Sequence, residues 1–148
     1  MSDGRTRRLS GCPIDYALDL FGDRWTLLVI RDFLFRGKRH FKELMESPER
    51  IASNILTARL KKLEERGLIE RHPDPDNRKQ VIYTLTDKGR DLTPVLVEMV
   101  RWGGRHDPDT LCPKNVVTLL TRDNERLLAD LREGMKGAAR KAQAKARR

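Results

Sequence analysis

One stretch of the chain, residues 53–63, combines leucines with small or cationic side chains at helical spacing. If Leu56, Leu60 and Leu63 face inward, a rotation of about 100° per residue turns other positions outward. The outward set consists of Asn54, Ala58, Lys61 and Lys62, with Thr57 on its flank and Ser53 at its start. Asn can pair with an adenine edge, Thr and Ala can touch a thymine methyl, and Lys can reach a guanine or a phosphate. Arg59 falls toward the protein and is predicted to be partly structural, bracing a phosphate contact.

A second group of polar side chains lies in residues 70–86, ERHPDPDNRKQVIYTLT. The runs LIERH and QVIYTLT read as two strands, the second by its period-two alternation. The turn formers between them are Pro73, Pro75, Asp76 and Asn77. This pattern predicts a hairpin whose stiff tip brings Asn77, Arg78 and Lys79 to the phosphates or minor groove of a duplex. The same phosphate-holding role is assigned to Lys38, Arg39 and His40. The alternative is an ordinary solvated turn.

Helices and strands must position these side chains. Apolar spacing and caps predict helices over residues 13–22, 23–35, 39–47 and 52–67, the second started by Asp23 and the last ended by Gly67. A helix over 86–105, capped by Thr86 and bent at Pro94, and a final helix over 121–135 follow the hairpin. Within this series, three successive helices followed by a two-stranded hairpin predict a mainly α fold with a small β-hairpin: a winged helix-turn-helix with flanking dimerisation helices.

Charge is distributed unevenly along the 148 residues, which carry a formal net charge of +9. The tail 135–148 contains six cations and no acid, and residues 1–11 are also basic. We therefore expect a flexible basic arm at 1–11, a DNA-binding domain at 12–105, a loop and dimerisation helix at 106–134, and a disordered basic tail at 135–148. No run approaches the roughly 18 apolar residues of a membrane helix, which predicts a cytoplasmic protein that associates with the nucleoid through DNA.

A family resemblance rests on three segments and a short motif: CPIDYALDLFGDRWTLLVIRDFLFRGKRHFKEL, IASNILTARLKKLEERGLIERH, VIYTLTDKGRDLTPVL and WG. Together they resemble the HxlR-type transcriptional regulators, winged-helix proteins related to the MarR group, over Cys12 to Gly103. The resemblance implies a prokaryotic homodimeric repressor or activator that binds a partly palindromic operator, with dimer contacts from the first and last helices. Ala52 stands where the family often has a serine cap, so capping is expected to pass to Ser53.

Two features concern assembly and regulation. The apolar stripes of the last two helices exceed what the domain body needs, and the predicted dimer contacts are Leu96, Met99, Leu127, Leu128 and Leu131. Cys12 stands where the family frequently has a cysteine, and some members use that thiol to sense oxidants or electrophiles. The alternative for Cys12 is a small buried apolar residue at the dimer interface. A small-molecule or oxidant effector therefore joins duplex DNA and a second copy of the chain as an expected partner.

Catalysis and metal binding have little support in the sequence. The three histidines are isolated, no nucleophile has a base in a known motif, and no glycine-rich phosphate loop occurs. The run HDPDTLC offers His106, Asp107, Asp109 and Cys112, but lacks a recognised ligand spacing. We expect no enzyme activity, cofactor or metal. Two other function classes remain open: a winged-helix protein-interaction module, and a redox or ligand sensor without direct DNA contact.

Overall fold

Two helices open the chain in the computed structural model, which describes residues 10–115, 129 and 133. The first, α1, spans Pro13–Phe21 and begins at a proline, whose missing N–H would have no partner there. The second, α2, spans Arg24–Phe35. As predicted, Asp23 caps α2: its carboxylate accepts hydrogen bonds from the amides of Trp25 at 2.9 Å and Thr26 at 3.0 Å.

The next two helices form the helix-turn-helix pair. The short α3 spans Phe41–Met45, and α4 spans Ser53–Glu65 with Leu56, Leu60 and Leu63 buried, as predicted. Gly67, at a φ of +76°, ends this segment in the left-handed region that glycine enters without strain. The expected transfer of the cap to Ser53 is wrong, because Ala52 occupies the cap position and no side chain caps α4.

A two-stranded antiparallel hairpin follows α4. Strand β1 spans Ile69–Pro73 and β2 spans Val81–Leu85, with Ile69 opposite Leu85 and Pro73 opposite Val81. Pro73 was predicted in the turn but is the last residue of β1, where a residue without an N–H costs little. The amide of Tyr83 also donates to the carbonyl of Arg39 at 2.9 Å, which attaches the hairpin to the segment before α3.

The predicted single helix over 86–105 is two helices, α5 at Asp87–Arg90 and α6 at Thr93–His106. The predicted bend at Pro94 is therefore wrong. Pro94 lies in the first turn of α6, where proline fits, and the helical conformation is interrupted before it, between Arg90 and Thr93. Thr86 caps α5 as expected, accepting from the amide of Gly89 at 3.2 Å. Its hydroxyl also donates to the carbonyl of Gly67 at 2.6 Å, which joins the start of α5 to the end of α4.

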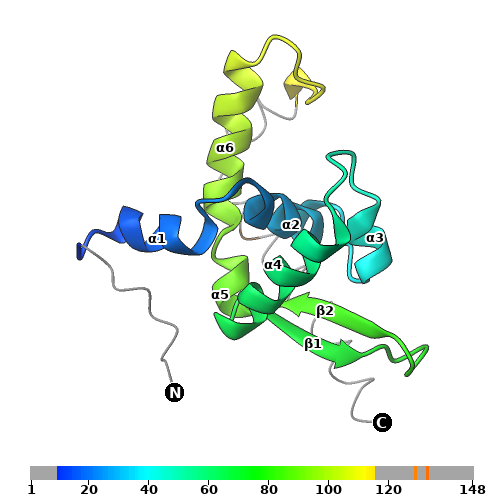
Figure 1. Cartoon of the computed structure of the whole chain (residues 1–148). Helices are drawn as coiled ribbons and strands as arrows, with labels where there is room; N and C mark the ends of the chain where they lie inside the picture. The colour runs from blue at the N-terminus through cyan, green and yellow to red at the C-terminus, as the bar shows by residue number, and fades with distance from the viewer. Residues whose placement is uncertain (1–9, 116–128, 130–132, 134–148) are drawn as a thin grey trace.

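One aliphatic core holds these elements together. It joins α2, which contacts α1, α4 and α6, to the helix-turn-helix pair and the base of the hairpin. Figure 1 shows α1 and α6 projecting away from this group. Leu96 of α6 is 6% exposed and packs in the core, so its predicted place in a dimer contact is wrong. The fold is the predicted one, mainly α with a small hairpin.

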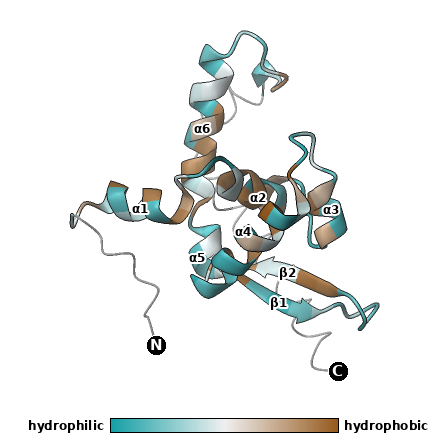
Figure 2. Ribbon diagram, in the orientation of Figure 1, coloured by the Kyte–Doolittle hydropathy of each residue, from teal (hydrophilic) through white to brown (hydrophobic). Residues whose placement is uncertain are grey.

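Both projecting helices contain hydrophobic residues, coloured brown on the ribbon in Figure 2, and several of these residues are exposed. On α6, Met99 is 52% and Trp102 70% exposed, and on α1, Ile14 is 69% and Leu18 57% exposed. Met99, predicted as a dimer contact, therefore lies on an open apolar surface. The predicted contacts Leu127, Leu128 and Leu131 lie outside the described residues, as do the helix at 121–135 apart from residues 129 and 133, the basic arm at 1–11 apart from residues 10 and 11, and the basic tail at 135–148.

Candidate nucleic-acid interface

The outward face of α4 is polar and open. Ser53, Asn54, Thr57, Ala58 and Lys61 are all exposed, opposite the buried leucines. The Thr57 hydroxyl donates to the carbonyl of Ser53 at 2.8 Å, which leaves its methyl group and an oxygen lone pair for other contacts. Lys61 lies 4.0 Å from Glu65, an ion pair between two exposed groups that contributes at most about 1 kcal/mol. The base-reading chemistry that the sequence predicts is therefore displayed on one helix face.

Two cations of α4 are instead tied to the first two helices. Arg59 Nε lies 2.9 Å from Asp23 Oδ1, in line with the predicted structural role of Arg59. Burial raises the pKa of Asp23, but hydrogen bonds from Thr26 and Arg59 outweigh it and lower that pKa to about 2. Lys62 was predicted to face outward, yet its ammonium donates to the carbonyl of Asp19 at 2.9 Å. These contacts fix α4 against α1 and the start of α2.

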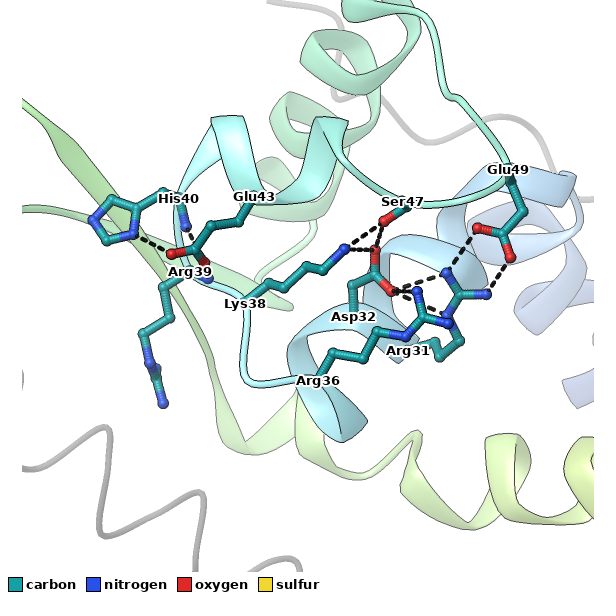
Figure 3. A network of polar contacts seen from close by, with 9 residues as sticks. All are labelled: Arg31, Asp32, Arg36, Lys38, Arg39, His40, Glu43, Ser47 and Glu49. Carbon is teal, nitrogen blue, oxygen red and sulfur yellow. Dashed lines mark hydrogen bonds and ion pairs between the residues drawn. The ribbon is translucent and has the colours of Figure 1, made fainter. Parts of the chain in front are cut away.

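A buried carboxylate organises the turn that leads into α4. Asp32 of α2 is 2% exposed and accepts from the Ser47 hydroxyl and from Arg31. Figure 3 shows the side chains that surround it, which include Arg36 and Lys38, each 3.4 Å from the carboxylate. A buried charge without such partners would cost several kcal/mol.

This network corrects one phosphate assignment. Lys38 was predicted to hold a phosphate, but its ammonium points inward and donates to Ser47 Oγ at 2.8 Å. Arg31 extends the network by donating two hydrogen bonds, of 2.6 and 2.9 Å, to the carboxylate of Glu49. The hydrogen bond from Arg31 lowers the pKa of Glu49 to about 2. Ser47 and Glu49 are thus anchored to α2, which sets the position of α4, the helix that follows them.

The tip of the hairpin is a hydrogen-bonded turn that carries two exposed cations. Asn77 Oδ1 accepts from the amide of Lys79 at 3.3 Å and the Asn77 carbonyl accepts from Gln80 at 2.8 Å, so this residue shapes the turn. Arg78 and Lys79 are exposed at the tip. Of the three residues assigned to phosphates ahead of α3, Arg39 has a side chain that extends away from its neighbours (Figure 3).

His40 has a different place from the predicted one. Its ring lies between two carboxylates, with Nδ1 3.0 Å from Glu43 Oε1 and Nε2 2.8 Å from Asp74 Oδ2. Both ring nitrogens are therefore occupied within the protein. The predicted phosphate contact is replaced by a link between α3 and the base of the hairpin tip.

Cys12 occupies the cap position of α1 and is exposed, whereas Cys112 is half-buried. The exposed position argues against a thiol buried within the protomer. The amides of Asp15 and Ile14 in the first turn lower the pKa of the Cys12 thiol, although the sulfur makes no cap hydrogen bond of ordinary geometry. A thiol of this kind combines the two requirements for reactivity, a depressed pKa and access.

The described residues contain neither a candidate metal site nor a candidate membrane span. Within residues 10–115, 129 and 133, no three His, Cys, Asp or Glu side chains gather in a way that could hold a metal ion. No helix in the same part of the chain has the length and apolar character needed to span a bilayer.

Comparison with known proteins places this arrangement in a family. The model of the HxlR-like helix-turn-helix family matches residues 20–110, which contain the α3–α4 pair and the hairpin. The chain belongs to the HxlR-like family. Proteins that resemble it include sll1512 of Synechocystis, an uncharacterized HTH-type transcriptional regulator that is 35% identical over 72% of this chain and 78% of its own. YodB of Bacillus subtilis, an HTH-type transcriptional regulator, is 40% identical over 68% of this chain and 92% of its own.

Solved structures agree with the assignment to the HxlR-like family. The crystal structure of PA1607 superimposes with a TM-score of 0.65 at 37% identity, covering 74% of this chain and 76% of that one. The reduced form of YodB from B. subtilis gives a TM-score of 0.55 at 37% identity, covering 68% of this chain and 99% of that one. The chain is thus an HxlR-type helix-turn-helix transcriptional regulator with a winged fold.

Proposed function

We propose that the protein binds duplex DNA through the outward face of α4 and the hairpin tip, and that residues 12–105 form this DNA-binding domain. The observation that carries the proposal is the open polar face of α4. Asn54 makes no side-chain hydrogen bond with other described residues, so its amide is available to a base edge. Arg78 and Lys79, exposed at the hairpin tip, add cations for the phosphates. The interaction-module alternative has less support, because this face displays no large apolar side chain.

The second part of the proposal is a homodimer. Exposed Ile14 and Leu18 on α1, with Met99 and Trp102 on α6, give an apolar surface that an isolated protomer leaves in water. A two-fold axis through this surface would set two recognition helices about 34 Å apart, one turn of DNA. A cytoplasmic regulator of this type acts as a repressor or an activator at a partly palindromic operator. We assign it no catalytic role, cofactor or metal.

Selection from a random-sequence DNA library with the purified protein tests this proposal. Two inverted copies of one half-site should be enriched, with centres about 10 base pairs apart or a multiple of that spacing. Enrichment of a single half-site would contradict the dimer. A library that stays random after repeated rounds would contradict sequence-specific binding and favour the interaction module.

We propose further that Cys12 makes the protein responsive to electrophiles or oxidants. Its exposure and lowered pKa support this role. The solved structures of YodB include a reduced and a quinone-bound form, and those of HypR a reduced and an oxidized form. A thiolate can add to a ring carbon of a quinone, and proton uptake then gives the thioether-linked hydroquinone. The site on α1 adjoins the proposed dimer surface, so an adduct there would disturb assembly.

Alkylation of the two thiols by iodoacetamide tests the reactivity of Cys12. Because its pKa is lowered from 9.0, the alkylation rate of Cys12 should rise with pH through a midpoint below that value. Benzoquinone should weaken operator binding by the wild type and by Cys112→Ser, but not by Cys12→Ser. A Cys12→Ser protein that still responds to benzoquinone would overturn the role of this thiol.

A further inference from the structure

His40 stands where three parts of the DNA-binding region meet. It occupies the cap position of α3, and its side chain bonds to Glu43 in the first turn of that helix. Its other ring nitrogen lies 2.8 Å from Asp74, the first residue after β1, whose side chain is 11% exposed. The imidazole thus bridges the helix-turn-helix pair and the hairpin across 34 positions of sequence.

Only the protonated ring donates a hydrogen bond to both carboxylates. A neutral imidazole has one N–H donor, whereas the imidazolium has two. Glu43 and Asp74 are both acceptors when ionised, so the neutral ring would turn a lone pair toward one of them. A neutral ring protonated at Nε2 would keep its bond to Asp74, but without the positive charge that pairs with the carboxylate. Charge-assisted hydrogen bonds of this kind are about twice as strong as neutral ones. The geometry therefore fits the imidazolium form of His40.

Asp74 connects His40 to the hairpin tip through hydrogen bonds. Its Oδ1 accepts from the amide of Asp76 at 2.9 Å, and its own amide donates to the carbonyl of Gln80 at 2.9 Å. These bonds enclose the turn that carries Arg78 and Lys79. At the other end of the bridge, Glu43 Oε2 accepts from the amide of Arg39 at 2.8 Å and so fixes the start of α3.

We propose that His40 is a positioning residue that pins the hairpin tip to α3, so that the grip of the tip on DNA weakens when the imidazolium loses its proton. The proposal rests on the DNA contact of the tip put forward under the proposed function. It assigns His40 no direct contact with DNA. The bond from Tyr83 to Arg39 holds the base of the hairpin independently, so loss of the pin loosens the tip without detaching the strands.

The pH range over which His40 pins the hairpin tip to α3 follows from the groups that face its ring. The hydrogen bond with Asp74, then that with Glu43, raises the pKa of His40 above 6.5, while the bond with His40 lowers the pKa of Asp74 below 3.8. Burial raises the pKa of Glu43, but bonds from Arg39 and His40 lower it below 4.5 overall. A raised histidine pKa means that the ion pairs of His40 with the two carboxylates are complete below pH 6.5 and are lost as pH rises through the raised value, which weakens the bridge. Because their pKa values are lowered, Glu43 and Asp74 become protonated and lose their ion pairs with His40 only in acid. The Arg39 side chain extends away from the ring (Figure 3).

Amide hydrogen exchange in the free protein tests the pin without DNA. As pH rises above the midpoint of the His40 titration, the amides of Asp74 and Gln80 should become about 2- to 10-fold less protected from exchange, after correction for intrinsic exchange rates. This is the factor that one hydrogen bond provides. His40→Gln should show the low protection at every pH. His40→Arg, a permanent cation with several donors, should keep protection at every pH. The buried amide of Leu60 serves as the reference for global stability.

Operator affinity, measured in parallel, separates this proposal from the one on which it rests. Wild-type affinity should fall over the same pH range as protection, with no such fall in His40→Arg. Equal tip protection in His40→Gln and wild type, at acidic and alkaline pH, would overturn the pin. Tip protection that responds to pH while operator affinity does not would support the pin and contradict the DNA contact of the tip.

Discussion

Met99→Glu is expected to lower affinity for an operator with two half-sites by roughly 10²- to 10⁴-fold, the gain that linking two binding modules provides. Met99 is 52% exposed on α6 beside Trp102, on the surface proposed for the dimer. A carboxylate in that interface would be removed from water without a partner, which costs several kcal/mol per protomer. One recognition helix would then have to bind alone. No residue assigned to DNA is altered.

Sedimentation equilibrium without DNA measures the first step of this prediction. The wild type should be a dimer at micromolar concentration and Met99→Glu a monomer. Two controls apply: Met99→Leu keeps the apolar surface, and Arg105→Gln makes the same change in net charge at an exposed polar position of α6. Both should remain dimers with wild-type affinity. A dimeric Met99→Glu protein, or a monomeric wild type, would contradict the proposed interface.

Asn54→Ala should cost about 1–3 kcal/mol on the operator and little on random DNA, because base contacts carry the specificity. Arg78→Ala should weaken binding to both DNAs and reduce the salt dependence of affinity, because a phosphate contact is independent of sequence. Titration of each variant with the operator and with a random duplex, at one fixed salt concentration, measures the two losses. Asn115→Ala is the matched control, since it makes the same substitution at an exposed position beyond α6.

The elements that position the site were predictable because their signals are local. The spacing of Leu56, Leu60 and Leu63 defines the inner face of α4 within three turns, and all three are buried. Asp23 indicates a helix start through its capping carboxylate, and Gly67 indicates a helix end because glycine can adopt a positive φ. Both residues have the predicted roles. The outer face of α4 follows directly from the inner one. Its contact with DNA stays a prediction.

Long-range partners could not be predicted in the same way. Lys62 was predicted on the outward face of the recognition helix and His40 as a phosphate contact, because each is a cation or titratable group near the predicted interface. Their partners are Asp19, 43 positions away, and Asp74, 34 positions away, and no local pattern reveals such pairs. The prediction that Leu96 is a dimer contact was wrong for a related reason. Helix α6 is apolar on two sides, and periodicity alone does not tell the core side from the exposed side.

One signal in the sequence would have revealed part of the turn network. Asp32 interrupts the apolar run TLLVIRDFLF, which was predicted to be a buried helix. A carboxylate inside a buried helix requires charged or hydrogen-bonding partners, which the structure supplies as Ser47, Arg31 and Lys38. The identity of those partners still depends on how the turn between α3 and α4 folds back onto α2.

The central claim is that the outward face of α4 reads bases, and a cycle of protein and DNA substitutions tests it most directly. Each base pair of the selected half-site is replaced in turn, and the affinities of the wild type and Asn54→Ala are measured for every duplex. The account predicts that Asn54→Ala loses discrimination at one position, by about 1–3 kcal/mol, and keeps it at the others. Unchanged discrimination at every position would contradict base reading by Asn54.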